Sequence, residues 1–144
     1  MSSTQHQPID SRTATATIYV VDGDQSILDG VRSLLETLGV EVRCFRSAEQ
    51  FLDTVSFGTP GCVVTELHLP GISGLELQKN LRQRGVDYPV IVMTSDADVS
   101  MAVRAMHLGA LDFIEKPFID RILIARVKQA LRTVASLSPH SKEH

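Results

Sequence analysis

Short apolar runs that alternate with helix-like patterns constrain the fold of this chain more than any other feature. The runs at 17–21 (TIYVV), 62–66 (CVVTE) and 88–94 (YPVIVMT) consist largely of β-branched and other apolar residues. A strand with one solvent-exposed face alternates apolar and polar residues, whereas a strand that is covered on both faces can be apolar throughout. The three runs are therefore predicted to be strands buried within a parallel sheet.

In the segments between these runs, apolar residues recur at the spacing of an α-helix. Helices are predicted from Leu28 to Leu38, over 47–55, over 74–84, from a cap at Asp98 to Gly109 and over 119–135, with two further strands over 40–45 and 111–115. The run at 40–45 (VEVRCF) is less uniformly apolar, so we expect it at an edge of the sheet. Five strands that alternate with five helices predict an α/β fold with a doubly wound parallel sheet.

Two polar stretches flank this pattern. Residues 1–16 are rich in Ser, Thr, Gln and Pro, and the last stretch (SLSPHSKEH) is equally polar. Such segments bury too little apolar surface to offset the entropy of ordering them. We predict one domain at 17–135 between disordered tails at 1–16 and 136–144.

Charge, hydropathy and cysteine spacing exclude several classes of function. The net charge is -3 without a basic block, so nucleic-acid binding by this chain alone is not expected. No apolar run approaches the roughly 18 residues of a membrane span, and the first residues lack the pattern of a secretory signal. Cys44 and Cys62 have no CxxC spacing, which favours reduced thiols and a cytoplasmic location.

Acids, a hydroxyl and a lysine stand where the predicted strands end. They are Asp22 and Asp24 after the first strand, Glu66 on the third, Thr94 on the fourth and Lys116 after the fifth. In an open α/β sheet, ligands bind where the carboxyl ends of the strands meet. A carboxylate can accept a phosphoryl group, acids can hold Mg²⁺, and a lysine and a hydroxyl can stabilise phosphoryl oxygens. The set therefore indicates phosphoryl-transfer chemistry.

Four segments make this indication specific. YVVDGDQS, VVTELHLPGISGLEL, VIVMTSDADVSMAV and GALDFIEKPF, in this order and spacing, resemble the receiver domain of two-component response regulators, of the FixJ type. The resemblance covers roughly residues 17 to 131 and implies a flavodoxin-like fold with strand order 2-1-3-4-5. It also implies a phosphorelay in which a histidine kinase forms an aspartyl phosphate on the domain. The family's switch face consists of the fourth helix, the fifth strand and the fifth helix.

The resemblance assigns roles to individual residues. Thr94 matches the family's switch hydroxyl, Phe113 its switch aromatic, and Lys116 its phosphate-stabilising lysine. Asp22 matches the first acid of the acidic pair, and Asp24 lies beside it. The peptide bond between Lys116 and Pro117 is implied to be cis.

Two positions depart from the family's pattern. Glu66 stands where the phosphoacceptor aspartate belongs, and Gly23 stands where the second acid, a direct metal ligand, belongs. A glutamate carries its carboxylate one methylene further out, and a displacement of about 1 Å can cost about a hundredfold in rate. Loss of a metal ligand weakens the same reaction. We therefore expect Mg²⁺ binding at Asp22 and Glu66 to be weak or absent.

These departures predict an atypical receiver that signals by protein–protein contact independent of phosphorylation. We expect it to be no enzyme, to hold no cofactor, and to bind a histidine kinase or another signalling protein. A receiver that still accepts phosphate weakly is the alternative. Glu66 has two interpretations: its charge takes the place of a phosphoryl group beside Lys116, or it is a solvated acid at a strand end.

The fourth predicted helix carries two apolar faces. Met101, Ala105 and Leu108 lie on one face, and Val99, Ala102 and Met106 lie on the other. A helix that is apolar on two sides needs a partner besides its own sheet. We assign the interface to Met101, Ala105 and Leu108 and expect a homodimer or a partner contact there.

An enzyme reading competes with these predictions. VVDGDQS also fits the D-x-D-x-[ST] opening of haloacid-dehalogenase-type phosphatases, with Asp22 as nucleophile and Asp24 as acid–base. Against it, no acidic pair follows Lys116, and the LPGISG and EKPF segments stay unexplained. Receivers of the FixJ type usually precede a DNA-binding output domain, and whether one belongs to this protein stays open at this point.

Overall fold

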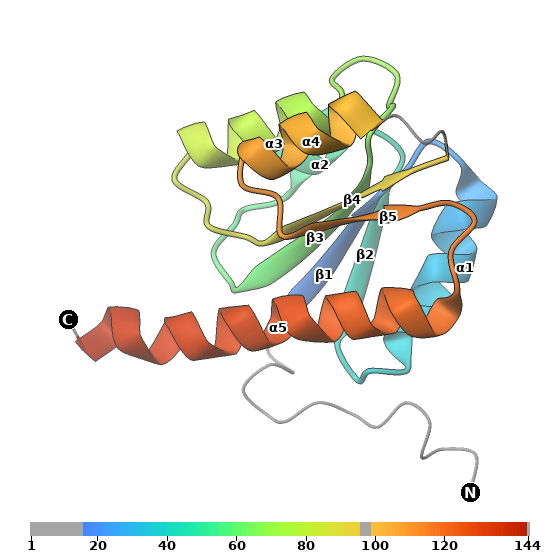
Figure 1. Ribbon diagram of the computed structural model, residues 1–144. Coiled ribbons are helices and arrows are strands. Elements are labelled where there is room, and N and C mark those ends of the chain that lie inside the picture. The colour runs from blue at the N-terminus through green and yellow to red at the C-terminus, as the bar shows by residue number, and fades with distance from the viewer. Residues whose placement is uncertain (1–15, 96–98, 144) are drawn as a thin grey trace, which may run out of the picture.

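A five-stranded parallel sheet runs through the middle of the molecule (Figure 1). The computed structural model describes residues 16–95 and 99–143. The strands are β1 (Thr17–Val21), β2 (Glu41–Phe45), β3 (Gly61–Glu66), β4 (Val90–Thr94) and β5 (Asp112–Glu115). Their order is β2-β1-β3-β4-β5, and every neighbouring pair is parallel. This confirms the doubly wound flavodoxin-like fold and the edge position of the second strand.

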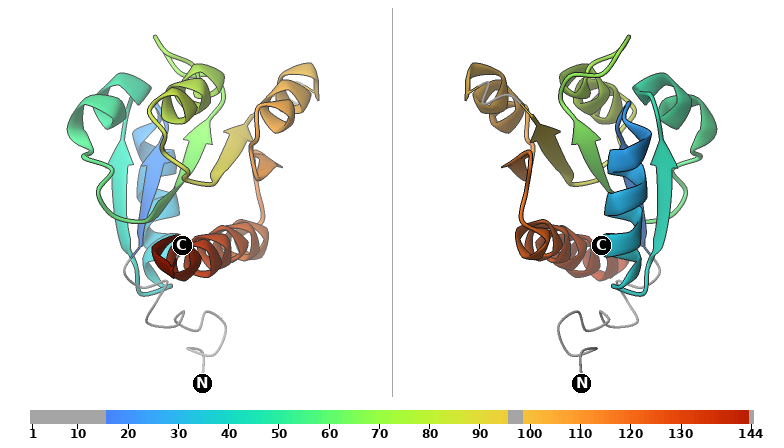
Figure 2. Two further views of the ribbon diagram at one scale, coloured as in Figure 1. Left: turned by 90° about the vertical axis from the view of Figure 1, so that its left-hand side faces the viewer. Right: turned by 90° about the vertical axis from the view of Figure 1, so that its right-hand side faces the viewer.

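Helices cover both faces of the sheet. They are α1 (Gln25–Glu36), α2 (Ala48–Thr54), α3 (Gly74–Gln83), α4 (Val99–His107) and α5 (Asp120–Glu143). Helices α1 and α5 lie on one face, and α2, α3 and α4 lie on the other (Figures 1 and 2). The core consists of two buried clusters of apolar residues, one on each face of the sheet. Along β1, Ile18 and Val20 belong to the cluster under α1 and α5, whereas Tyr19 and Val21 belong to the cluster under α2, α3 and α4. The continuous apolar run of β1 thus reflects burial on both faces.

The ends of the described domain differ from the prediction. Ala16, expected in the N-terminal tail, is buried against the core, while the rest of that tail lies outside the described residues. Helix α5 continues to Glu143, although we expected a polar tail from residue 136. Polarity predicts that a segment is exposed, and it does not by itself prevent the backbone from staying helical.

The packing of α4 contradicts one residue of the predicted interface. Ala105 has no exposed surface, whereas Met101 and Leu108 pack, partly buried, against the cluster under α2 and α3. Among the side chains of this helix whose burial is described, Val103 and Met106 are the large apolar ones that are exposed. Helical spacing finds apolar faces but not which of them the sheet covers, so the assignment had to come from the packing. Asp98, the expected cap, lies outside the described residues.

Candidate acidic site at the strand ends

Asp22 follows β1 directly and is nearly buried, with 2% of its surface exposed. Its backbone N–H donates to the carbonyl of Phe45 at 3.0 Å, which continues the pairing of β1 with β2. The Asp22 Oδ1 atom accepts from the backbone N–H of Asp24 at 2.9 Å. The strand pairing and this turn together direct the carboxylate into the edge of the sheet.

Asp24 turns away from that edge and caps α1. Its Oδ1 atom accepts from the backbone N–H of Ser26 at 2.9 Å and from the Ser26 hydroxyl at 2.7 Å. The hydrogen bond from the Ser26 hydroxyl, followed by that from the backbone, lowers the pKa of Asp24. Asp24 is therefore a helix cap and not a ligand or acid–base group in this arrangement.

Glu66 ends β3, and both of its carboxylate oxygens are engaged. Oε1 lies 2.6 Å from Nζ of Lys116, and Oε2 accepts from the backbone N–H of His68 at 2.9 Å. Only 6% of the surface of Glu66 is exposed. The interpretation of Glu66 as a solvated acid is therefore wrong.

Lys116 joins the two carboxylates. Its Nζ atom donates to Oδ2 of Asp22 and to Oε1 of Glu66, each at 2.6 Å, while only 12% of its side chain is exposed. Burial alone would lower the pKa of Lys116, but the hydrogen bonds that its ammonium donates to Asp22 and Glu66 outweigh this effect and raise the pKa above its usual range. The ammonium is thus held in its charged form between two acids.

Thr94 lies at this edge, and Phe113 lies on the outside of β5. The backbone N–H of Lys116 donates to the carbonyl of Thr94 at 2.7 Å, and Thr94 is fully buried. The peptide bond from Lys116 to Pro117 is cis, as the resemblance implied. Phe113 is 39% exposed. Of the predicted site residues, the structure brings Asp22, Glu66 and Lys116 into contact and leaves Phe113 at the surface.

Comparison with known proteins identifies the family of this chain. A family model described as "Response regulator receiver domain" matches residues 18–128. The chain belongs to the receiver family. This assignment leaves the phosphatase reading without support, and it accounts for the four segments whose order and spacing had indicated a receiver.

Several relatives of the receiver are transcriptional regulators. The chain is 37% identical over 148 residues to the transcriptional regulatory protein FixJ of Bradyrhizobium diazoefficiens, covering 91% of this chain and 72% of FixJ. It is 48% identical over 117 residues to FixJ of Azorhizobium caulinodans, covering 79% of this chain and 54% of that protein. The chain thus spans only part of each of these relatives.

Solved receivers have the same fold. The response regulator StyR aligns with a TM-score of 0.84 at 36% identity, covering 90% of this chain and 66% of StyR. The receiver domain of NtrX from Brucella abortus aligns with a TM-score of 0.75 at 33% identity, covering 81% of this chain and 98% of that domain.

Gly23 of this receiver stands in a place with room for a side chain. A Cβ atom added there would lie 3.6 Å from Cδ of Pro70 and 3.9 Å from the carbonyl oxygen of Arg46, which is ordinary contact. Neither the backbone conformation nor the packing therefore demands glycine at this position. The missing acid is a difference in chemistry and not a consequence of the fold.

The side chains of this receiver do not fit a Mg²⁺ ion. Oδ2 of Asp22 and Oε1 of Glu66 both bind the Lys116 ammonium, and Gly23 contributes no carboxylate. Among residues 16–95 and 99–143, no group of three His, Cys, Asp or Glu side chains could hold a metal. A hard dication needs several oxygen ligands, and two carboxylates that already share an ammonium do not supply them.

Sequence reasoning missed two residues that support the site. Nη2 of Arg46 donates to the carbonyl of Gly23 at 2.8 Å. Oε2 of Glu49 accepts from the backbone N–H of Ile72 at 2.9 Å and so holds the loop that follows Glu66. Glu49 follows the cap of α2, where acids are common, so nothing in the sequence marked it as a partner of a loop 23 residues away.

Within the described part of the chain, no helix is both long and apolar enough to cross a membrane.

Proposed function

We propose that this receiver does not accept a phosphoryl group in the usual way and that it signals by protein–protein contact. The observation that carries the proposal is the bridging position of Lys116, 2.6 Å from both Asp22 and Glu66, beside a position that holds Gly23. Lys116 offsets one of the two negative charges of this edge from within the chain itself. This pairing needs neither a metal ion nor a kinase.

The geometry of Glu66 supports the loss of phosphoryl acceptance. A nucleophilic carboxylate needs an oxygen that can approach phosphorus in line, with a cation to neutralise the developing charge. Here Oε1 binds Lys116 and Oε2 binds the backbone N–H of His68. The Glu66 side chain, one methylene longer than an aspartate, extends to the ammonium of Lys116. Glu66 thus holds a negative charge where the family forms a phosphate.

The distribution of exposed apolar side chains supports signalling by contact. The large apolar residues that are exposed in the described part of the chain all lie on α4, on β5, directly before α5 or in its first turn. They are Val103, Met106, Phe113, Ile119 and Ile122. The elements that carry these residues adjoin one another at the β5 edge of the sheet (Figure 2). Clustered apolar exposure marks an interaction surface.

The partner we propose for this surface is a signalling protein or a second copy of the chain. Interaction with a histidine kinase follows from membership of the receiver family, and the contact would not require phosphate transfer. We also propose a cytoplasmic location, in keeping with two cysteines, Cys44 and Cys62, that form no disulfide.

Restoring the two departures tests the loss of phosphoryl acceptance. The native chain, Gly23→Asp, Glu66→Asp and the double variant are each incubated with Mg²⁺ and acetyl phosphate and measured by intact mass. We expect the native chain to gain no phosphoryl group and the double variant to gain one. The double variant with Asp22→Asn added should lose the adduct, because one of its metal ligands is then removed. A stoichiometric, Mg²⁺-dependent adduct on Glu66 of the native chain would overturn the proposal.

Glu66→Gln tests whether the charge of Glu66 matters for contact. The amide keeps the size of the side chain but not its charge, so the pairing with Lys116 is weakened. We expect partner binding or self-association to change in this variant, whereas Glu76→Gln, an exposed acid on α3, should leave both unchanged. Unchanged binding and oligomeric state in Glu66→Gln would exclude a signalling role for the charge.

A further inference from the structure

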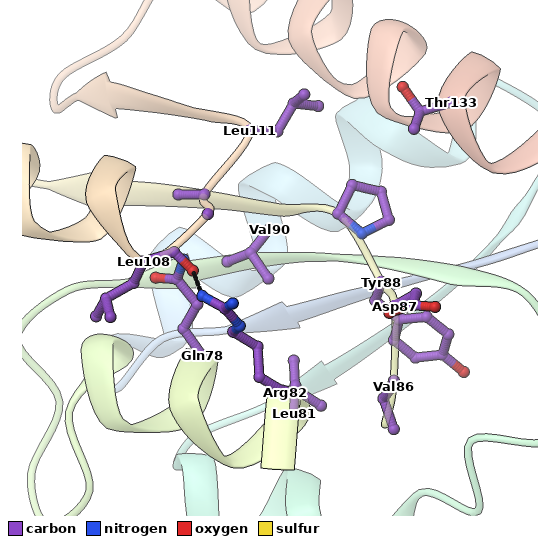
Figure 3. Close-up of a pocket in the computed structure, with 13 residues that line it drawn as sticks. Gln78, Leu81, Arg82, Val86, Asp87, Tyr88, Val90, Leu108, Leu111 and Thr133 are labelled. Atoms are coloured by element: carbon purple, nitrogen blue, oxygen red, sulfur yellow. Dashed lines mark hydrogen bonds between the residues drawn. The ribbon is translucent and has the colours of Figure 1, made fainter. Parts of the chain in front are cut away.

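A pocket of about 530 Å³ opens at the edge of the sheet opposite the acidic site, where β4 begins (Figure 3). It lies between the last turns of α3 and α4 and the far part of α5, and its volume is within the range of small-molecule sites, roughly 300–1,000 Å³. Its apolar lining includes Leu81, Val86, Val90, Leu108 and Leu111. None of these residues takes part in the receiver's acidic site.

Gln78 brings a hydrogen-bond acceptor to this pocket. Its side chain is 3% exposed, and its Nε2 donates to the carbonyl of Ala105 at 3.1 Å. Its Oε1 is buried and has no partner among the described residues. Rotating the amide would set Oε1 against the Ala105 carbonyl, so the orientation is fixed by the donor. Buried acceptors are nearly always paired, and a donor from a ligand would pair this one.

The backbone N–H groups of the wall are already used within the protein. Gly109 donates to the carbonyl of Met106 at 3.0 Å, and Leu111 donates to that of Val90 at 2.8 Å. Val86 likewise donates to the carbonyl of Leu81 at 2.9 Å. The wall therefore offers a ligand few backbone donors, which disfavours anions and other acceptor-rich molecules.

The charge of the wall favours a cation. Helices α3 and α4 both end here, and helix C-termini carry partial negative charge. Asp87 adds a carboxylate to the lining. A cation of the protein itself already binds this wall: Nη1 of the Arg82 guanidinium donates to the carbonyl of Leu108 at 2.8 Å (Figure 3). Arg82 is exposed, so it can leave this carbonyl without disturbing the core.

We propose that this pocket binds a small amphipathic cation, with an apolar body between the helices and an amine or amidine head on the wall of Gln78 and Leu108. The head takes the place of the Arg82 guanidinium at the Leu108 carbonyl and donates to Oε1 of Gln78. The body contacts the apolar side chains of the lining. Apart from Arg82, which the head displaces, the polar groups named here offer a ligand acceptors and so select for donors.

Benzamidine is the probe that tests this selection, with benzoate as its matched control. Both have the same ring, but benzamidine carries a cationic donor head and benzoate an anionic acceptor head. The full chain is titrated with each and followed by ¹H–¹⁵N NMR. We expect saturable shifts at Leu108, Leu111 and the side-chain amide of Gln78 with benzamidine alone. Equal shifts with benzoate, or no saturation with benzamidine, would overturn the proposal.

Two variants test the roles of individual groups. Gln78→Met keeps the side-chain volume but removes the acceptor, so binding should weaken about threefold to tenfold. Arg82→Ala removes the internal competitor for the Leu108 carbonyl, so binding should tighten by about the same factor. Lys79→Ala, on the exposed side of α3, should change neither.

If Gln78→Met fails to fold, the affinity of Arg82→Ala for benzamidine tests the proposal by itself. Its site is exposed, so it leaves the core intact. Tighter binding of benzamidine by this variant supports the proposal, and weaker or unchanged binding contradicts it.

Discussion

The ammonium of Lys116 lies 2.6 Å from Oε1 of Glu66, although the two residues are 50 positions apart in the chain. The contact forms because β4 brings the ends of β3 and β5 to one edge, with Thr94 accepting from the backbone of Lys116. The same ammonium reaches Asp22, 94 positions away, at 2.6 Å. One nearly buried cation therefore binds the acids of two strands and offsets one of their two charges, and the stability of the site depends on it.

Lys116→Met should lower the free energy of unfolding by about 3 kcal/mol near neutral pH, because it leaves two nearly buried carboxylates without their counterion. The loss should be smaller at high pH. The folded-state pKa of Lys116 is raised, so its stabilisation is fully present below the unfolded pKa of about 10.4 and is lost as the pH rises through the folded value.

Urea unfolding of the native chain and of Lys116→Met, from about pH 8 to about pH 12, measures how the difference in their free energies of unfolding shrinks as the pH rises. Lys79→Met, an exposed lysine on α3, serves as the control and should track the native chain throughout. A gap between native chain and Lys116→Met that stays constant up to the highest pH would contradict the assigned ion pair.

Gly74→Ala should destabilise the protein by about 1–3 kcal/mol. A Cβ at position 74 would lie 2.5 Å from the carbonyl oxygen of Glu66 and 3.0 Å from Cα of Leu67, so the backbone of the site itself must move. Thermal unfolding measures the loss, and a chemical-shift change at Lys116 would report the displaced carboxylate.

Gly30→Ala provides the matched substitution. Nothing lies within 4 Å of a Cβ at Gly30, which stands inside α1. Alanine should stabilise the helix there by about 0.5–1 kcal/mol. Equal effects of the two substitutions would mean that the close approach of α3 to the end of β3 is not important for stability.

Mg²⁺ should raise the melting temperature of the double variant Gly23→Asp, Glu66→Asp and leave that of the native chain unchanged. A cation that binds only the folded state stabilises it, and the variant supplies the carboxylate that position 23 lacks. Gly58→Asp adds the same charge on an exposed loop and should show no response. A Mg²⁺-dependent shift in the native chain would show that Lys116 yields its place to the ion.

Replacing Val103 and Met106 by lysine should abolish self-association through α4. Both side chains are exposed, at 45% and 42%, and two charges on an apolar surface oppose burial. Light scattering over a range of protein concentrations checks this, with Thr37→Lys at the end of α1 as the control. A native chain that stays monomeric at high concentration would leave a different protein as the partner of this surface.

Local sequence patterns are enough to predict the order of the elements and the edge of the sheet where the functional side chains lie. The apolar run of β1 predicted burial on both faces, and the positions of Asp22, Glu66 and Lys116 after their strands predicted one common edge. These features are local, because periodicity along a chain reports directly how each segment is buried. The departures from the receiver family's pattern at Gly23 and Glu66 could likewise be identified from the sequence alone.

The contacts of those residues could not be predicted before the chain was seen folded. The pairing of Lys116 with both acids, the exposed side of α4 and the pocket beside Gln78 each depend on side chains from distant segments. A helix with two apolar faces can be packed in either of two ways, and its spacing is the same in both. The choice is made by the shape of the sheet it covers, which forms only when all five strands are in place.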